Sequence, residues 1–137
     1  MLIAGGGQIG IETAHLLHEQ GLDVTVIEML GDILMKEEPL TRATIMPVIL
    51  GSGMQILTDH RIEKVSEHAV TVTDLHTQEA KDLPFDTMVM ALGTKPYNPL
   101  ESAAREAFSD VRVIGDAQAT ANIAEATKAG FFAGLNI

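Results

Sequence analysis

The sequence predicts an α/β fold: a Rossmann-like parallel sheet flanked by helices, with a small antiparallel β meander, in three layers. Two observations carry this prediction. A short apolar run at residues 2–4 leads through a glycine-rich loop into an amphipathic stretch at residues 8–19. Further short apolar runs then alternate with helical segments, an order that implies parallel strands joined by right-handed crossovers.

The composition indicates a globular chain with an aliphatic core. Apolar residues make up 46% of the 137 residues, whereas aromatic residues make up only 4% and tryptophan is absent. A core of this kind suits buried parallel strands and the helices that cover them. The chain has no cysteine, which excludes disulfides, thiolate catalysis and cysteine-ligated zinc or iron–sulfur clusters. The lack of cysteine fits a reducing compartment, so we expect a cytoplasmic protein.

The net charge of −10, from 19 acidic and 9 basic residues, argues against a nucleic-acid partner and against an anionic membrane surface. The sequence has no run of about 18 apolar residues and no signal-peptide pattern, so we expect no membrane partner. An anionic cofactor would therefore have to be held by local features, such as the backbone amides at a helix start.

The order of the elements follows from apolar runs and from glycine and proline breaks. Pro39 stands at an allowed first-turn position of the second helix, and Pro47 inside that helix predicts a kink or an early end. The chain begins abruptly in a strand and ends abruptly in a helix, so we expect a longer parent chain. We expect strands at 2–4, 23–28, 55–58, 87–91 and 111–114, helices at 8–19, 39–50 and 119–137, and meander strands at 61–66 and 70–74.

The loop between the first strand and the first helix has the spacing G-x-G-x-x-G, which is typical of dinucleotide binding when it joins a strand to a helix. Gly5 allows the tight turn, Gly7 lets the backbone approach a pyrophosphate, and Gly10 lets the helix pack closely on the strand. The alternative is a glycine-rich turn with no ligand. We expect the whole loop to bind the nucleotide: Gly5, Gly6, Gly7, Gln8, Ile9 and Gly10.

Glu28 ends the second predicted strand, 18 residues after Gly10. A carboxylate at this place can accept hydrogen bonds from the adenosine ribose hydroxyls, and it would repel a 2′-phosphate. No arginine follows within the next several residues, and Lys36 is distant. The sequence therefore favours NAD(H) over NADP(H), while the alternative is a surface glutamate at a strand end.

Four stretches in this order go beyond a generic nucleotide fold. They are IAGGGQIGIETA (residues 3–14), VTVIE (24–28), MVMALGTKP (88–96) and VRVIGDA (111–117). Together they resemble the pyridine-nucleotide-binding part of two-dinucleotide flavoproteins. Within that class the chain is most similar to the carboxy-terminal region of the 2,4-dienoyl-CoA reductase, trimethylamine dehydrogenase and enoate reductase group, often labelled NADH oxidase. The resemblance covers essentially the whole chain.

In such flavoproteins the NAD domain is inserted into an FAD domain. The resemblance implies that residues 1–110 form the NAD(P)H-binding Rossmann domain and that residues 111–137 are the carboxy-terminal strand-helix piece of a split FAD-binding domain. It implies that Gly93 lies beside the nucleotide and that Asp116 hydrogen-bonds the flavin nucleotide. It also matches Glu12 to an acid that lies near the nicotinamide and the flavin. From the residues alone, Asp116 can equally be a helix N-cap, and Glu12 a partly buried helix carboxylate.

The sequence thus predicts a dinucleotide-binding fragment of a flavin-dependent oxidoreductase. The resemblance implies a parent that passes hydride from NAD(P)H to FAD and on to an acceptor such as an enoyl-CoA or enoate. A second glycine fingerprint for FAD and the barrel domain of such proteins are absent from the chain. We therefore predict no catalytic residue, no metal ligand and no turnover by the chain alone. Its expected partners are NAD(P)H and the missing FAD and barrel domains.

Two alternatives stay open. An NAD-sensing regulatory Rossmann module, attached to a transporter or a repressor, would share the glycine loop and Glu28. A fragment with no measurable ligand would leave apolar surface exposed and would self-associate. His15 and His18 lie three residues apart on the first helix, but no third ligand is spaced to join them, so we expect helix surface rather than a metal site.

Overall fold

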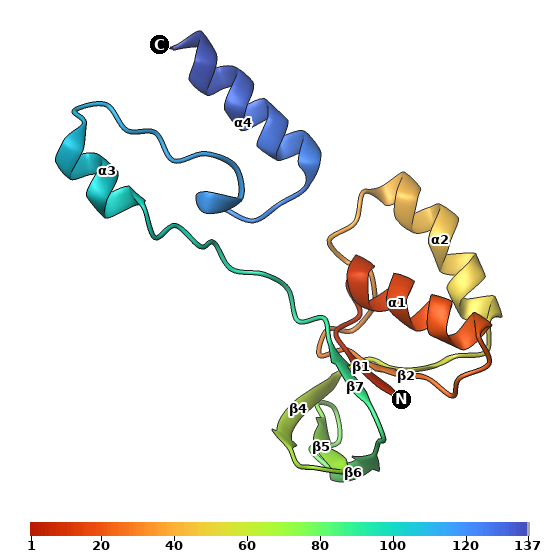
Figure 1. Ribbon diagram of the computed structural model, residues 1–137. Coiled ribbons are helices and arrows are strands. Elements are labelled where there is room, and N and C mark those ends of the chain that lie inside the picture. Colours follow the sequence, from red (N-terminus) through yellow and green to blue (C-terminus); the bar gives the residue numbers. More distant parts are fainter. Residues whose placement is uncertain (137) are drawn as a thin grey trace. The chain divides into compact units, whose positions relative to one another are not determined.

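The computed structural model describes residues 1–136 and divides into two compact units (Figure 1). The first unit is Met1–Gly93 and the second is Thr94–Ile137, of which Ile137 lies outside the described residues. The break between the compact units follows Gly93, and the domain boundary expected after residue 110 stays a prediction. The chain leaves the first unit soon after the last strand of that unit.

The first unit contains a parallel sheet of four strands. They are β1 (Leu2–Ala4), β2 (Thr25–Ile27), β3 (Gln55–Leu57) and β7 (Met88–Met90). Their order across the sheet is β3-β2-β1-β7, and all neighbouring strands run parallel. This confirms the predicted Rossmann-like sheet. All but β1 are shorter than predicted, since their flanking residues leave the ladder for loops.

Two helices cover one face of this sheet (Figure 1). They are α1 (Gln8–Glu19) and α2 (Pro39–Gly51). The bounds of α1 are those predicted. Of the two outcomes predicted at Pro47, a kink or an early end, the early end does not occur, because the helix continues to Gly51. The Glu38 side chain caps α2 by accepting hydrogen bonds from the amides of Thr41 and Leu40, which hold the pKa of Glu38 below its ordinary value.

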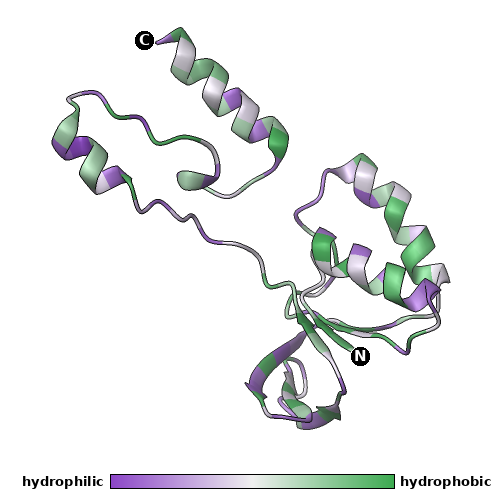
Figure 2. Cartoon of the chain, viewed as in Figure 1, coloured by the Kyte–Doolittle hydropathy of each residue, from purple (hydrophilic) through white to green (hydrophobic). Residues whose placement is uncertain are grey.

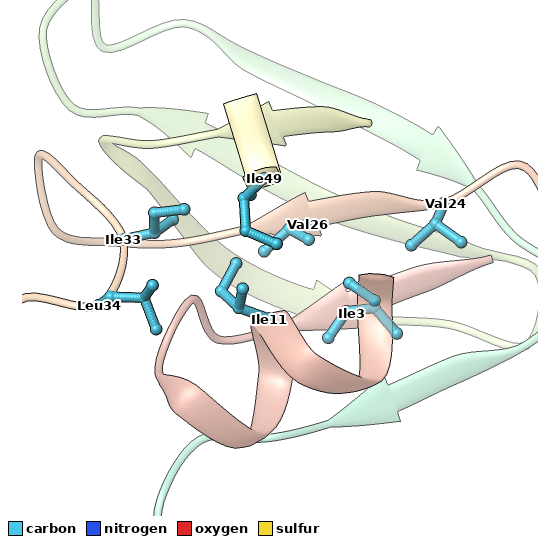
Figure 3. Packing of buried hydrophobic residues seen from close by; sticks show 8 residues of the cluster. Ile3, Ile11, Val24, Val26, Ile33, Leu34 and Ile49 are labelled. Atoms are coloured by element: carbon cyan, nitrogen blue, oxygen red, sulfur yellow. The ribbon is translucent and has the colours of Figure 1, made fainter. Parts of the chain in front are cut away.

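The core between the sheet and these helices is aliphatic, as the composition predicted. Figure 3 shows Ile3 and Val26 of the sheet packed with Ile11 of α1, and all three are fully buried. Ile33 and Leu34, from the loop between β2 and α2, belong to the same cluster and are 2% exposed. This loop is therefore part of the core rather than a free connection.

The opposite face of the parallel sheet packs against a small antiparallel sheet. Its strands, in spatial order, are β4 (His60–Val65), β5 (Ala69–Asp74) and β6 (Ala80–Pro84). Leu2 and Ile27 of the parallel sheet form a second buried cluster with Val70 and Val72 of β5. The three predicted layers are therefore present. The third strand of the meander, β6, was not predicted, because it is mostly exposed and lacks an apolar alternation.

The second unit contains two helices and a short 3-10 turn. They are α3 (Glu101–Ala107), η1 (Gly115–Ala117) and α4 (Ile123–Leu135). The predicted strand at residues 111–114 is wrong, because this segment joins neither sheet. The predicted helix from residue 119 begins only at Ile123, because Asn122 Oδ1 accepts a hydrogen bond from the amide of Glu125 and caps the helix there.

The last helix, α4, carries apolar residues that the second unit does not bury. Ile123, Phe131, Phe132 and Leu135 are between 52% and 86% exposed. Figure 2 shows hydrophobic and hydrophilic segments alternating along α4. Neither α3 nor α4 contains a buried residue, so this unit has no core comparable with that of the first unit. No helix among residues 1–136 is long and apolar enough to cross a membrane.

Two isoleucines of α1 test the assignment of the core. We expect Ile11→Ala, which empties a fully buried position, to lower the free energy of unfolding by about 2–5 kcal/mol. Ile9→Ala is the matched control, because Ile9 is 66% exposed and its loss should change stability by less than about 0.5 kcal/mol. Urea unfolding followed by circular dichroism measures both. Equal losses for the two variants would contradict the packing described here.

Candidate functional site

The glycine loop joins β1 to α1, which is the strand–helix junction that the sequence predicted. Gly5 has a φ of 106°, a left-handed value that side-chain-bearing residues rarely adopt. A Cβ at Gly5 would also lie 2.4 Å from the carbonyl oxygen of Ala91, in the chain that follows β7. Gly5 is therefore required both for the turn and for the close approach of a neighbouring strand's end.

Gly10 is needed for packing at the start of α1. A Cβ at this position would lie only 2.0 Å from the carbonyl oxygen of Gly5 and 3.3 Å from the Cβ of Ala91. At Gly10 itself, the close contact is therefore with the main chain of the loop that follows β1.

Gly7 differs from these two glycines, because nothing lies within 4 Å of a Cβ built on it. Its φ of −74° is also open to other residues. The folded chain itself therefore does not require glycine at this position. The open space is what a ligand would use if it approached the backbone here.

The amino end of α1 is free of capping side chains. Gly7 precedes the helix and provides no side-chain cap, and the first turn contains no acidic residue. The first i to i−4 hydrogen bond runs from the amide of Ile11 to the carbonyl of Gly7 at 2.9 Å. The amides ahead of Ile11 and the positive end of the helix dipole favour an anion at this place.

Glu28 directly follows β2, and its side chain turns to the glycine loop. Its Oε2 accepts a hydrogen bond from the amide of Gly6 at 2.6 Å, and its Oε1 accepts one from the amide of Leu30 at 2.8 Å. A Cβ at Gly6 would lie 3.1 Å from Glu28 Oε2 and 2.8 Å from Cγ2 of Ile33. The G-x-G-x-x-G pattern allows any residue at position 6, so the sequence did not predict that Gly6 bonds to Glu28. The run of three consecutive glycines, Gly5 to Gly7, was the feature that could have indicated it.

The loop between β2 and α2 is tied to the same glycine. The amide of Leu34 donates to the carbonyl of Gly6 at 2.8 Å, so both main-chain polar groups of Gly6 bond to this loop. At the far side of the loop, Arg42 of α2 forms an ion pair with Asp32. Nε of Arg42 also donates to the carbonyl of Ile33 at 3.3 Å.

Arg42 qualifies one expectation. In the sequence, no arginine follows Glu28 within the next several residues. Folding brings Arg42 back to this loop from the first turns of α2. Arg42 is ten residues from Asp32 in the sequence and reaches it only because α2 folds back on the preceding loop, so residue spacing alone did not predict this contact.

The remaining predicted site residues have varied surroundings. Gln8 donates from Nε2 to Oε1 of Glu12 at 2.9 Å on the exposed side of α1. Gly93 has a φ of 92°, and nothing lies within 4 Å of a Cβ built there. Asp116 lies in η1 of the second unit, where its Oδ1 accepts a long hydrogen bond of 3.4 Å from the amide of Ala121. Asp116 therefore does not cap α4, whose N-cap is Asn122.

The two histidines of α1 have different partners. His18 Nε2 lies 3.0 Å from the carbonyl oxygen of Ser52, whereas His15 Nδ1 lies 3.8 Å from a carboxylate oxygen of Glu19. Within the described part of the chain, no group of three or more metal-ligating side chains comes together.

The fold and this junction define a Rossmann-type domain, the class in which a glycine loop after the first strand and an acid after the second face one edge of the sheet. Residues 1–126 match the family described as pyridine nucleotide-disulphide oxidoreductase. The chain therefore belongs to the pyridine nucleotide-disulphide oxidoreductase family.

The chain is also similar to curated relatives in sequence and to a solved structure in fold. The chain is 34% identical to an NADH oxidase of Thermoanaerobacter brockii over 96% of its length and 30% identical to a cinnamate reductase of Clostridium sporogenes over its whole length. It spans only 20% and 21% of those proteins. The fold matches a 2-naphthoyl-CoA reductase structure with a TM-score of 0.84 at 24% identity, covering 99% of this chain and 21% of that one.

Two glycines of the loop should respond differently to alanine. We expect Gly10→Ala to lower the free energy of unfolding by about 1–3 kcal/mol, because its methyl group would overlap the backbone of Gly5. We expect Gly7→Ala to cost only about 0.5–1 kcal/mol, since the methyl group meets open space and the cost is that of alanine at the N-cap of α1. Thermal unfolding followed by circular dichroism measures both. A Gly7→Ala variant as unstable as Gly10→Ala would show that the loop packs differently.

Proposed function

We propose that this chain binds a pyridine dinucleotide, with NAD(H) preferred over NADP(H), through its glycine loop and Glu28. The observation that carries the proposal is the hydrogen bond of 2.6 Å from the amide of Gly6 to Glu28 Oε2. It joins a carboxylate to the loop that opens α1. These are the two features that hold the ribose and the pyrophosphate in dinucleotide-binding Rossmann domains.

Glu28 keeps acceptor capacity for a sugar. A carboxylate offers about four lone-pair sites, and the amides of Gly6 and Leu30 use two of these on Glu28. The hydroxyl groups of an adenosine ribose would donate to the others. A 2′-phosphate would bring a like charge against the same carboxylate, which is the physical basis for the preference for NAD(H).

We assign the pyrophosphate to the amides at the amino end of α1, contributed by Gln8, Ile9 and Gly10. The open space beside Gly7 lets the phosphates approach the main chain. Gly93 follows β7 by three residues, and the Ala91 carbonyl of that connection abuts Gly5. We place Gly93 on the other side of the bound nucleotide for this reason.

The parent protein that we propose is a flavin-dependent oxidoreductase, in which hydride passes from NAD(P)H to FAD and on to an acceptor such as an enoyl-CoA or enoate. The names of the relatives, NADH oxidase and cinnamate reductase, support this class. The nicotinamide and flavin supply the redox chemistry, and this chain supplies binding and orientation. We propose that residues 111–137 belong to a split FAD-binding domain, with Asp116 bonding the flavin nucleotide, and that this chain alone does not turn over.

Calorimetric titration with NADH, NADPH and FAD side by side tests the proposal. We expect NADH to bind more tightly than NADPH. Glu28→Ala should raise the dissociation constant for NADH about tenfold or more, because hydrogen bonds to a charged acceptor are lost. Glu19→Ala is the matched control, since Glu19 lies exposed at the far end of the same helix. Unchanged NADH affinity in Glu28→Ala would remove this residue from the site.

Gly7→Ala separates ligand binding from folding. We expect this variant to fold normally and yet to bind NADH at least about tenfold more weakly, because its methyl group occupies the space assigned to the pyrophosphate. Circular dichroism and calorimetry on the same sample measure the two properties. Wild-type affinity in a folded Gly7→Ala variant would place the phosphates elsewhere.

A further inference from the structure

Arg42 lies against the loop after Glu28, and without its ion-pair partner it would be available to a phosphate. Arg42 reaches this loop from α2 and donates from Nε to the carbonyl of Ile33. The side chain of Ile33 in turn lies against Gly6, on the side where Glu28 Oε2 also lies. The guanidinium is thus bonded to the segment that forms the ribose side of the proposed site, where Rossmann proteins specific for NADP carry an arginine.

The carboxylate of Asp32 pairs with the Arg42 guanidinium. Asp32 of the loop and Arg42 of α2 form an ion pair, and their side chains are 46% and 32% exposed. Oδ1 of Asp32 also accepts a hydrogen bond from the amide of Ile33 at 2.8 Å, which fixes the orientation of the carboxyl group. A guanidinium neutralised in this way has less attraction for a second anion than a free one.

We propose that Asp32 is a specificity-determining residue that discriminates against NADPH by keeping Arg42 occupied. This inference rests on the proposed function and goes beyond it, because Glu28 acts by direct repulsion of a 2′-phosphate, whereas Asp32 acts through the arginine. Removing the charge of Asp32 releases a cation that is bonded to the loop after Glu28, and this weakens the preference for NADH. Asp32 is therefore a positioning residue and need not touch the nucleotide.

Asp59 provides a matched control. Its carboxylate faces the same loop, with Oδ1 3.4 Å from a Cβ built on Gly31, but it pairs with His76 at 3.2 Å and not with an arginine. Asp59 has a φ of 54°, which asparagine also tolerates. Asp59→Asn and Asp32→Asn therefore each remove one negative charge beside the loop, and only the second releases Arg42.

The experiment compares dissociation constants for NADH and NADPH by calorimetry on the full chain. We expect Asp32→Asn to lower the ratio of the NADPH to the NADH constant about tenfold, the effect of one charge-assisted hydrogen bond to phosphate. Asp32→Ser, which can still accept from the amide of Ile33, should give the same shift. Asp59→Asn should change the ratio less than about twofold, because Asp59 pairs with His76 and its loss releases no arginine.

A double variant and a salt series test whether Arg42 causes the shift in nucleotide preference. Adding Arg42→Met to Asp32→Asn should restore the wild-type ratio, and the gain in NADPH affinity should shrink as salt is raised. An unchanged ratio in both Asp32 variants, or an equal shift in Asp59→Asn, would overturn the inference. The proposed function would still stand in that case, provided that the wild-type protein binds NADH. Wild-type protein that binds neither nucleotide would instead overturn the proposed function, and the inference with it.

Discussion

The main chain of Gly6 is the joint on which the arrangement of the site depends. Its amide donates to Glu28 Oε2 at 2.6 Å, and its carbonyl accepts from the amide of Leu34 at 2.8 Å. A Cβ there would lie 2.8 Å from Cγ2 of the buried Ile33, so a side chain would force this part of the core to shift. The two hydrogen bonds of Gly6 therefore join the loop after β1 to the loop after β2. The bond from the Gly6 amide also orients the Glu28 carboxylate.

The order of the strands makes the joint possible. Because β1 and β2 are parallel neighbours, with Ala4 opposite Ile27, the loops that follow them leave from the same edge of the sheet. The amide of Gly5 still bonds to the carbonyl of Ile27 at 2.8 Å, which continues the pairing into the loop. On the other side of β1, the end of β7 brings Ala91 against Gly5. A glycine loop flanked by two strand ends cannot move independently of the sheet.

Local spacing predicted the parts of this site that depend on neighbours in the chain. The bounds of α1, the turn at Gly5 and the position of Glu28 followed from periodicity and from the glycine pattern. The ion pair between Asp32 and Arg42 did not, because a helix start had to fold back on the preceding loop. Residues 111–114 alternate like a strand, but a strand also needs a partner, and none lies within the described residues.

The four glycines of the loop answer two different requirements. Gly5, Gly6 and Gly10 are each explained by contacts inside the folded chain, where a Cβ would lie 2.0 to 2.8 Å from another atom. These three would be needed even if the protein had no ligand, so they support the fold and say little about binding. Gly7 has no such explanation, because a side chain there would meet open space. Gly7 and the acceptor sites of Glu28 therefore support a bound ligand more strongly than the glycine pattern as a whole does.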